Sequence, residues 1–261
     1  MAELCALYSG STGNSYFIGS KSAGVLVDIG RSAKQTTNIL KRCAVDPLAV
    51  NGILITHEHS DHVSGLRVFA ARYQIPVFAS VGTLTALESM GILDGSFPAY
   101  TIEGTLQLGD MQISTFRTPH DCAESLGYRI RTVDNKVVTV ATDLGYVTPQ
   151  IEENLLGADL AVLESNHDIG MLRTGPYPYS LKRRILSDCG HLSNTACSEL
   201  LPTLYENGTK RFMLAHLSRE NNTPDIARQT AVCGMQMAGI ENGYILDVAP
   251  IENLDGRTIE F

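Results

Sequence analysis

The chain has 261 residues, of which 44% are hydrophobic and 18% charged, and its formal net charge is −8. This length and composition are typical of one large globular domain, so we expect a single domain over residues 1–261 and exclude a disordered chain. The acidic balance argues against a broad, non-specific nucleic-acid surface, although bound divalent cations would offset it locally.

The sequence shows no sign of secretion or membrane insertion. The opening residues Met1–Cys5 lack the basic and apolar regions of a secretory signal, and no apolar run approaches the roughly 18 residues of a membrane span. We therefore expect a cytoplasmic protein with no membrane partner. The six cysteines form no CxxC pair, which favours reduced thiols over disulfides.

The first part of the chain predicts an antiparallel meander, because short apolar runs are separated by Gly-rich turns. Helical and strand patterns then alternate along the rest of the chain. The predicted strands are Leu4–Tyr8, Ser15–Ile18, Gly24–Ile29, Gly52–Thr56, Pro76–Ala79, Met111–Thr118, Leu126–Arg131, Val137–Thr142, Leu160–Glu164, Phe212–His216 and Tyr244–Val248. The predicted helices are Ala33–Arg42, Asp61–Tyr73, Pro149–Leu156, Pro178–Ser187, Thr195–Asn207 and Pro224–Ala238.

This order of elements predicts an α/β fold of four layers, an αββα sandwich of two mixed sheets flanked by helices. The chain contains no Pro-, Gly- or Ser-rich linker, no low-complexity tract and no repeat of fixed period. The pattern therefore gives no reason to divide it into further domains.

The most informative segment is the run from His57 to His62. It follows the apolar strand Gly52–Thr56 and places four metal-binding side chains within six residues. A single histidine is more often a surface or hydrogen-bonded core residue, but so dense a cluster is typical of a metal site. Asp61 and His62 fall at a helix start, where they can reach a second ion. The four side chains are His57, His59, Asp61 and His62.

Three further residues follow predicted strands in the same manner. His120 comes after Met111–Thr118, Asp143 after Val137–Thr142, and His216 at the end of Phe212–His216. Strand ends are where an α/β fold collects the groups of its active site.

This set resembles the metallo-β-lactamase superfamily, in the THxHxDH run, in Asp28 of the segment LVDIG, and in the order of the downstream His, Asp and His. The resemblance implies that two divalent metal ions, Zn or Mn, are bound per chain, and that Asp28 orients ligands without binding metal. Two such ions would lower the pKa of a bridging water and stabilise both attacking and leaving oxygens, which predicts hydrolysis. The implied ligands are His57, His59 and His120 for one ion, Asp61, His62 and His216 for the other, and Asp143 as the bridge.

Three segments bear on the substrate. The turn Ser9–Asn14 either closes a plain hairpin or presents Ser11 and Asn14 to an anion. The segment Glu164–Asp168 adds His167, which we expect near the site as a catalytic residue together with Asp61.

The third segment is GHLSN. Its His191 either belongs to a capping loop or contacts a substrate phosphate and protonates a leaving alkoxide, with Ser193 and Asn194 as substrate-binding neighbours at a helix start.

Taken together, SGSTGN, THEHSDH, TPHDC, ESNHD, GHLSN and HLSRENN resemble the YycJ-type branch of the superfamily, also called WalJ. The resemblance implies a bacterial cytosolic 5′→3′ exonuclease acting on DNA. The chain departs from the related ribonuclease J and ribonuclease Z groups, because it has neither a large inserted clamp domain nor a long Gly/Pro-rich arm. Substrate contacts would therefore come from local segments such as Leu172–Tyr179 and Lys182–Arg184, unless the latter is only a solvated helix face.

Two other functions stay open. A small-molecule hydrolase for a lactone or thioester would suit the acidic charge and the missing clamp. A regulatory binding module without chemistry is disfavoured by the intact ligand set. Exposed tyrosines would favour the nuclease because aromatic rings stack on bases, although aromatic residues near proline are also common packing residues. The candidate tyrosines are Tyr100, Tyr146, Tyr177 and Tyr179.

Overall fold

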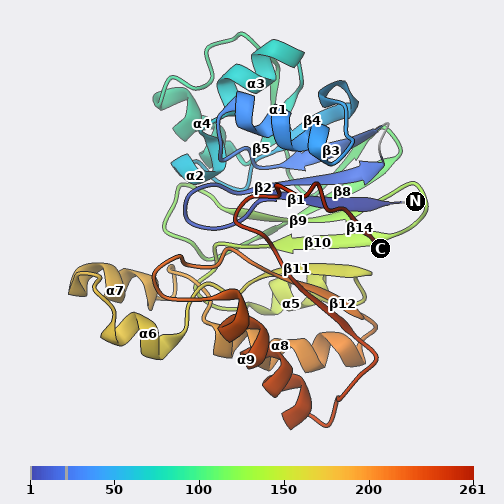
Figure 1. Ribbon diagram of the computed structural model, residues 1–261. Helices are drawn as coiled ribbons and strands as arrows, with labels where there is room; N and C mark the ends of the chain where they lie inside the picture. Colours follow the sequence, from blue (N-terminus) through green and yellow to red (C-terminus); the bar gives the residue numbers. More distant parts are fainter. Residues whose placement is uncertain (1, 21–22) are drawn as a thin grey trace. The chain divides into compact units, whose positions relative to one another are not determined.

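A computed structural model describes residues 2–20 and 23–261. Within these residues the strands form two mixed sheets of seven strands each, and helices flank them (Figure 1). The expected α/β class with two mixed sheets is thereby confirmed. The described chain forms two compact units, the first taking in residues up to Thr115, Cys122–Lys136 and Pro250–Phe261, the second Phe116–Asp121 and Val137–Ala249. The expectation of a single domain stays a prediction.

The first sheet has the order β14-β1-β2-β3-β4-β5-β6. Its first strands form the expected antiparallel meander, with Leu4 opposite Ile18, and β3, β4, β5 and β6 are parallel. Because β3 and β4 are parallel, the residues that follow them emerge at the same edge of the sheet. The strands are β1 (Glu3–Tyr8), β2 (Ser15–Ser20), β3 (Ala23–Val27), β4 (Val50–Leu54), β5 (Val77–Ala79), β6 (Ala99–Thr101) and β14 (Ile259–Glu260).

Helices cover this sheet within the first unit, and Figure 1 shows α1 and α3 beside β3, β4 and β5. They bury Leu40, Leu66 and Phe69 in a core shared with Leu26 and Ile53 of the strands. The helices are α1 (Ala33–Arg42), η1 (Pro47–Ala49), α2 (Ser60–Val63), α3 (Leu66–Tyr73) and α4 (Val81–Ser89).

The helix predicted over Asp61–Tyr73 is two helices in the structure, α2 and α3. A continuous helix would pair the Gly65 N–H with the Asp61 carbonyl. Instead the Asp61 carbonyl accepts from Asn14 N (2.8 Å), and Gly65 N donates to the Ile29 carbonyl (2.9 Å). Tertiary hydrogen bonds therefore replace helical ones at the break.

The second sheet has the order β13-β12-β11-β10-β9-β8-β7. Strands β10 to β13 are parallel, and β7 and β8 form an antiparallel pair. The parallel part lies in the second unit, so the residues that follow its strands share one edge. The strands are β7 (Thr105–Leu108), β8 (Met111–Arg117), β9 (Leu126–Arg131), β10 (Val137–Ala141), β11 (Leu160–Glu164), β12 (Arg211–Ala215) and β13 (Ile245–Val248).

The helices of the second unit bury a separate core in which Leu201 and Leu204 of α8 and Ala231 of α9 meet Phe212 and Leu214 of β12. Helices α8 and α9 lie against each other. No helix of the described chain is long and apolar enough to cross a membrane. The helices are α5 (Pro149–Leu155), α6 (Ile169–Thr174), α7 (Tyr179–Ile185), α8 (Asn194–Glu206) and α9 (Pro224–Met237).

The sequence did not predict six short elements, η1, α4, α6, β6, β7 and β14. Strand β6 has three residues, all exposed, and therefore lacks the alternation that marks a half-buried strand. Helix α4 contains a glycine and β-branched residues, which lower helix propensity, and Ser80 supports it by accepting from Thr83 N.

The expectation that all the cysteines are reduced is wrong for one pair. Cys5 of β1 and Cys43 at the end of α1 form a disulfide, and both are buried in the core of the first unit. They are 38 positions apart and belong to no motif. Only the packing of α1 against β1 brings the two sulphur atoms together. The cysteines outside this disulfide are Cys122, Cys189, Cys197 and Cys233.

Replacing Gly65 with alanine tests the packing at the break. Its φ of −95° suits any residue, but a Cβ there would lie 2.1 Å from the Arg31 carbonyl oxygen. We expect Gly65→Ala to lower the free energy of unfolding by about 3 kcal/mol, because backbone must move to relieve the clash. Urea denaturation measures this loss.

Gly104→Ala is the matched control. There φ is +72° and no described atom lies within 4 Å of the added Cβ, so only the strain of the left-handed conformation remains, about 1 kcal/mol. Equal losses in the two variants would contradict the packing argument.

Candidate metal centre

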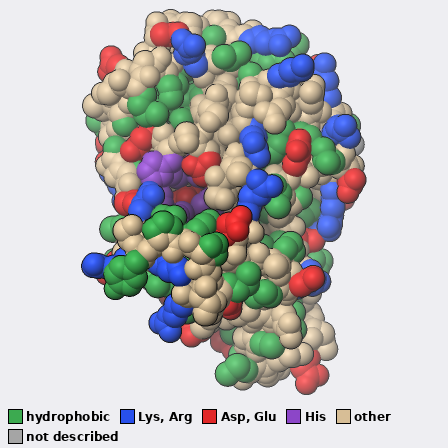
Figure 2. Space-filling view, turned by 60° about the vertical axis from the view of Figure 1, so that its left-hand side comes forward, with side chains coloured by type: hydrophobic (Ala, Val, Ile, Leu, Met, Phe, Trp, Pro, Cys, Tyr) green, Lys and Arg blue, Asp and Glu red, His purple; other side chains and the backbone are tan. Residues whose placement is uncertain are grey.

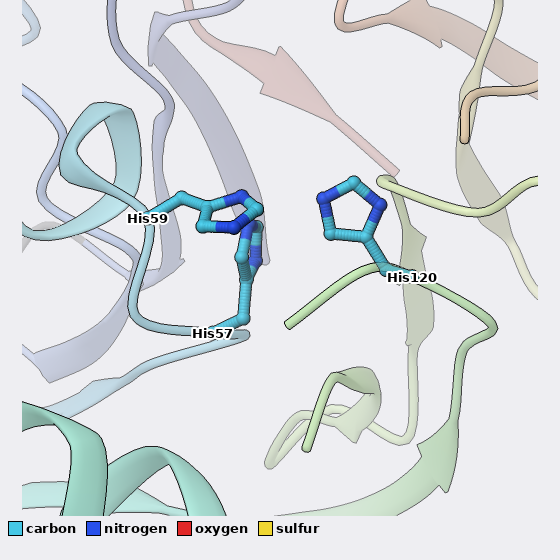
Figure 3. Close-up of side chains that lie close together, drawn as sticks. All are labelled: His57, His59 and His120. Carbon is cyan, nitrogen blue, oxygen red and sulfur yellow. The ribbon is translucent and has the colours of Figure 1, made fainter. Parts of the chain in front are cut away.

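The loop that leaves β4 carries His57 and His59 (Figure 3), and α2 carries His62. The rings of His57 and His59 have centroids 4.6 Å apart, and those of His57 and His62 are 4.1 Å apart. The side chains of His57 and His62 are buried, while His59 and Asp61 are partly exposed. Four groups able to bind a metal therefore gather at one end of β4.

Asp28 holds two of these rings through hydrogen bonds, His62 directly and His57 through Thr56. It follows β3 at the shared sheet edge, is 1% exposed, and accepts from His62 Nδ1 (2.8 Å), Thr56 Oγ1 (2.8 Å) and Thr56 N (2.8 Å). Thr56 Oγ1 in turn lies 3.0 Å from His57 Nδ1. Because the Thr56 hydroxyl donates its hydrogen to Asp28, its oxygen acts as the acceptor for His57 Nδ1. One carboxylate thus fixes the Nδ1–H tautomer of two histidines, which leaves Nε2 as the nitrogen of each ring that could bind a metal.

Burial is the largest influence on Asp28 and raises the pKa of this carboxyl above its ordinary value. The charge and hydrogen bond of His62 and the hydrogen bonds from Thr56 oppose that effect. The carboxylate form therefore depends on cationic or hydrogen-bonding partners nearby.

The Ser9–Asn14 turn contributes Asn14 to the same cluster. The Asn14 side chain is fully buried, its oxygen accepts from Gly10 N (2.9 Å), and its nitrogen lies 3.3 Å from Asp61 Oδ2 and 3.1 Å from His62 Nε2. Ser11 is exposed at the tip of the turn. Gly30 lets this turn approach, because a Cβ at position 30 would lie 1.7 Å from the Asp61 carbonyl oxygen.

The second unit gathers another set of groups after its strands. His120 follows β8 (Figure 3), Asp143 follows β10 and His216 follows β12. Asp143 Oδ1 lies 3.4 Å from His216 Nδ1 and 3.8 Å from His120 Nε2, and His120 Nδ1 is 3.2 Å from the Gly190 carbonyl. The carboxylate of Asp143 is therefore central in this group.

Three of the residues that leave these strands have left-handed backbone conformations. The φ angles are 61° at Asp28, 58° at Asp143 and 55° at His216. Such angles are uncommon for non-glycine residues and cluster at functional sites. Each turns the chain sharply at a strand end, so that the next residues do not continue the strand.

Glu164 is the residue that the sequence interpretation missed. It ends β11, is fully buried, and its Oε1 accepts from both His191 Nδ1 and His216 Nδ1, each at 2.8 Å. Its Oε2 accepts from the backbone N–H groups of Leu144 (3.0 Å) and Leu192 (3.1 Å). With both oxygens occupied in this way, Glu164 orients His191 and His216, and it lies with Asp143 and these two histidines in a cluster that could hold a metal ion.

Burial alone would raise the pKa of Glu164, but the charges and hydrogen bonds of His191 and His216 outweigh it and hold this pKa well below its usual range. The sequence signal was present. Glu164 ends an apolar parallel strand, and a place just after such a strand had drawn attention to Asp143, but His167 was singled out in this segment instead.

His191 and His167 occupy different environments. His191 is partly exposed, with 20% of its side chain accessible, and histidine side chains reach the surface beside acidic ones in Figure 2. His167 is 1% exposed, and neither of its ring nitrogens has a hydrogen-bond partner among the described residues. Burial lowers the pKa of His167 to about 4. His167 is therefore a neutral imidazole at neutral pH.

Ser193 and Asn194, which lie two and three positions after His191, have structural contacts. Ser193 caps α8 by accepting from Ala196 N (3.1 Å). The buried Asn194 accepts from Ser165 Oγ (2.7 Å) and donates to Asn222 Oδ1 (2.9 Å). The side-chain amide of Asn194 already has these internal partners, so its hydrogen bonds do not support a substrate contact. That contact stays a prediction.

Imidazole nitrogens and carboxylate oxygens at the ends of strands in two mixed sheets define a metal-dependent hydrolase. A family model described as "Beta-lactamase superfamily domain" matches residues 24–217. The chain is 38% identical over 247 residues to "Exodeoxyribonuclease YycJ" of Bacillus anthracis, covering 93% of this chain and 92% of the relative. It is 37% identical over 251 residues to "Exodeoxyribonuclease WalJ" of Streptococcus pneumoniae serotype 2, covering 94% and 93%.

Among solved structures, the metallo-β-lactamase fold protein YhfI from Bacillus subtilis matches with a TM-score of 0.74 at 16% identity, covering 100% of both chains. The chain belongs to the metallo-β-lactamase superfamily. Its donor set fits the metals of that superfamily, since it consists of imidazole and carboxylate without thiolate.

Asp28→Asn tests the support of the histidines. An amide of the same size cannot accept from His62 Nδ1 and both Thr56 groups at once, so we expect metal affinity to fall about 10- to 100-fold while the fold is retained. Competition with a chelator, followed by elemental analysis, measures the affinity.

Asp94→Asn is the control, because Asp94 is an exposed carboxylate of the same unit that hydrogen-bonds Ser96. Wild-type metal affinity in a folded Asp28→Asn protein would show that Asp28 has no part in orienting ligands.

Proposed function

We propose that this chain is a metal-dependent phosphodiesterase, a 5′→3′ exonuclease that acts on DNA. The observation that carries the proposal is the Glu164–His191 pair, which places a partly exposed imidazole beside the metal-binding groups of the second unit. Two relatives called exodeoxyribonucleases, each matched over more than nine-tenths of its length, support the same substrate.

The proposed cofactors are two divalent ions per chain, Zn or Mn. When bound, such ions acidify a water molecule and offset the charge of the phosphate and the leaving oxygen. Asp143 is the proposed bridge, in keeping with its central place among the histidines of the second unit. The proposed ligands are His57, His59 and His120 for one ion, and Asp61, His62 and His216 for the other.

His191 is the proposed general acid. Glu164 accepts from its Nδ1, which leaves Nε2 to face the substrate and to donate a proton to the leaving alkoxide. Glu164 is thus a positioning residue for His191.

The remaining site residues have more limited proposed roles. His167 acts as a neutral hydrogen-bonding group and not as an acid, because burial lowers its pKa to about 4. Asp61 acts as a ligand that Asn14 supports through its side-chain nitrogen. Ser11 and Ser193 remain proposed substrate contacts, since Ser11 is exposed and Ser193 partly so. The cytoplasmic location stays a prediction.

A substrate panel tests the proposal. We expect the Zn- or Mn-loaded protein to release nucleotides stepwise from the 5′ end of phosphorylated DNA, as measured by gel electrophoresis of 3′-labelled strands. Intact DNA and RNA together with rapid turnover of lactones or thioesters would favour the small-molecule hydrolase instead.

His191→Ala tests the general acid. We expect turnover of DNA to fall by roughly 10²- to 10⁴-fold with metal content unchanged, because a proton donor is lost but no ligand is. Elemental analysis and single-turnover kinetics provide the two readouts. Loss of bound metal in this variant would make His191 a structural residue of the metal site.

A further inference from the structure

The segment from Asp168 to Ser187, which contains α6 and α7, is called the basic arm here. It carries four basic residues and one acidic residue, a net charge of +3, in a chain whose formal net charge is −8. The rest of the chain therefore has a net charge of −11. Positive charge is concentrated in one short segment. The charged residues of the arm are Asp168, Arg173, Lys182, Arg183 and Arg184.

Both ends of the basic arm meet at the Glu164–His191 pair. The arm begins four residues after Glu164 and ends four residues before His191. The side chains of Glu164 and His191 are joined by a 2.8 Å hydrogen bond. The His191 N–H donates to the Ile185 carbonyl (3.0 Å), and Asp168 caps α6 by accepting from Met171 N (2.7 Å). The arm is thus a closed loop that starts and finishes at the proposed catalytic pair.

Two of the four cations hold the arm in place. Lys182 Nζ donates to the carbonyls of Arg173 (2.8 Å) and Gly175 (2.7 Å), which ties α7 to the end of α6. Arg184 makes a two-pronged contact with Asp121 through its Nε and its Nη2, the latter 3.0 Å from Oδ1. Asp121 immediately follows His120, so this contact fastens the arm beside a proposed metal ligand.

The other two cations, Arg173 and Arg183, do not hold the arm in place. Arg173 and Arg183 are exposed, and within the described chain no hydrogen bond or ion pair engages either guanidinium group. Tyr179 lies between them in sequence and is 77% exposed, so its ring is not a packing residue. Figure 2 shows basic and apolar side chains next to one another on the face that includes this part of the second unit.

We propose that Arg173, Arg183 and Tyr179 form a docking surface for single-stranded DNA that leads the strand to the site; this rests on the proposed nuclease function. Guanidinium groups bind phosphates along the backbone, and an exposed aromatic ring stacks on a base of any identity. An acidic protein partner would use the cations but would not need the ring. A DNA strand that ends at His191 would account for the exposed cations, for the exposed ring and for the closure of the arm at the Glu164–His191 pair.

The test is the double variant Arg173→Ala/Arg183→Ala, with Tyr179→Ala as a separate variant. Binding of a fluorescent 5′-phosphorylated oligo(dT) is followed by anisotropy over a series of salt concentrations. We expect the slope of log affinity against log salt to fall in magnitude by about 1.4 in the double variant, since each phosphate contact on a single strand contributes about 0.7. Tyr179→Ala should weaken binding about 5- to 100-fold without changing that slope.

A small substrate separates binding from chemistry. Hydrolysis of bis(p-nitrophenyl) phosphate should be unchanged in all variants, because the three residues lie outside the proposed ligands and the Glu164–His191 pair. The matched control is Lys34→Ala/Lys41→Ala on α1, which removes two exposed charges from the other unit and should leave the salt slope as in the wild type.

The outcomes distinguish failure of the docking surface from failure of the proposed nuclease function. Wild-type slope and affinity in both arm variants, in a protein that degrades DNA, would overturn the docking surface alone. A wild-type protein that neither binds nor degrades DNA would overturn the proposed nuclease function. Loss of binding to phosphatidylglycerol vesicles, with binding to oligo(dT) retained, would assign the arm to a membrane surface and also overturn the proposal.

Discussion

Two buried carboxylates, one in each unit, determine how four of the seven histidines are oriented. Asp28 holds His62 directly and His57 through Thr56, while Glu164 holds His191 and His216 directly. In each case the carboxylate engages Nδ1. The opposite nitrogen, Nε2, is then held in a fixed orientation, which a metal or a substrate needs and which a histidine in solvent would not supply.

The two carboxylates differ in how their charge is balanced. Glu164 has two imidazoles and two backbone N–H groups around it, and these neighbours lower its pKa in spite of complete burial. Asp28 has one imidazole and Thr56, and burial prevails, so its pKa is raised. A buried carboxylate with fewer compensating partners gains more from a cation close by. A cation bound near Asp28 would therefore stabilise the carboxylate charge more than a cation near Glu164 would.

The sequence predicted the sheets and the chemistry better than it predicted the contacts between segments. Apolar strands such as Leu160–Glu164 and the dense run at His57 have local signals, and the structure contains both. At the break in the predicted helix the sequence offers only Gly65, a weak signal, because the break is fixed by hydrogen bonds of Asp61 and Gly65 to Asn14 and Ile29, far away in the sequence.

The same reason accounts for the residues whose roles were missed. Glu164 acquires its importance from His191 and His216, which follow it by 27 and 52 positions. Asn14 resembles an ordinary turn residue until the fold brings it to Asp61 and His62. Cys5 and Cys43 likewise become partners only through packing. A pattern within one segment identifies which residue types are present, whereas long-range contacts decide which of them act together.

Charge is distributed to suit an anionic polymer in spite of the acidic composition. A net charge of −8 repels nucleic acid from most of the surface, and a local excess of positive charge in the basic arm would then select the approach to one place. The contacts of Lys182 and Arg184 fix that segment. Less conformational entropy would therefore be lost when a strand binds to Arg173 and Arg183. Because the arm is closed by the Glu164–His191 hydrogen bond, a strand held on it would be close to the proposed proton donor without any separate clamp domain.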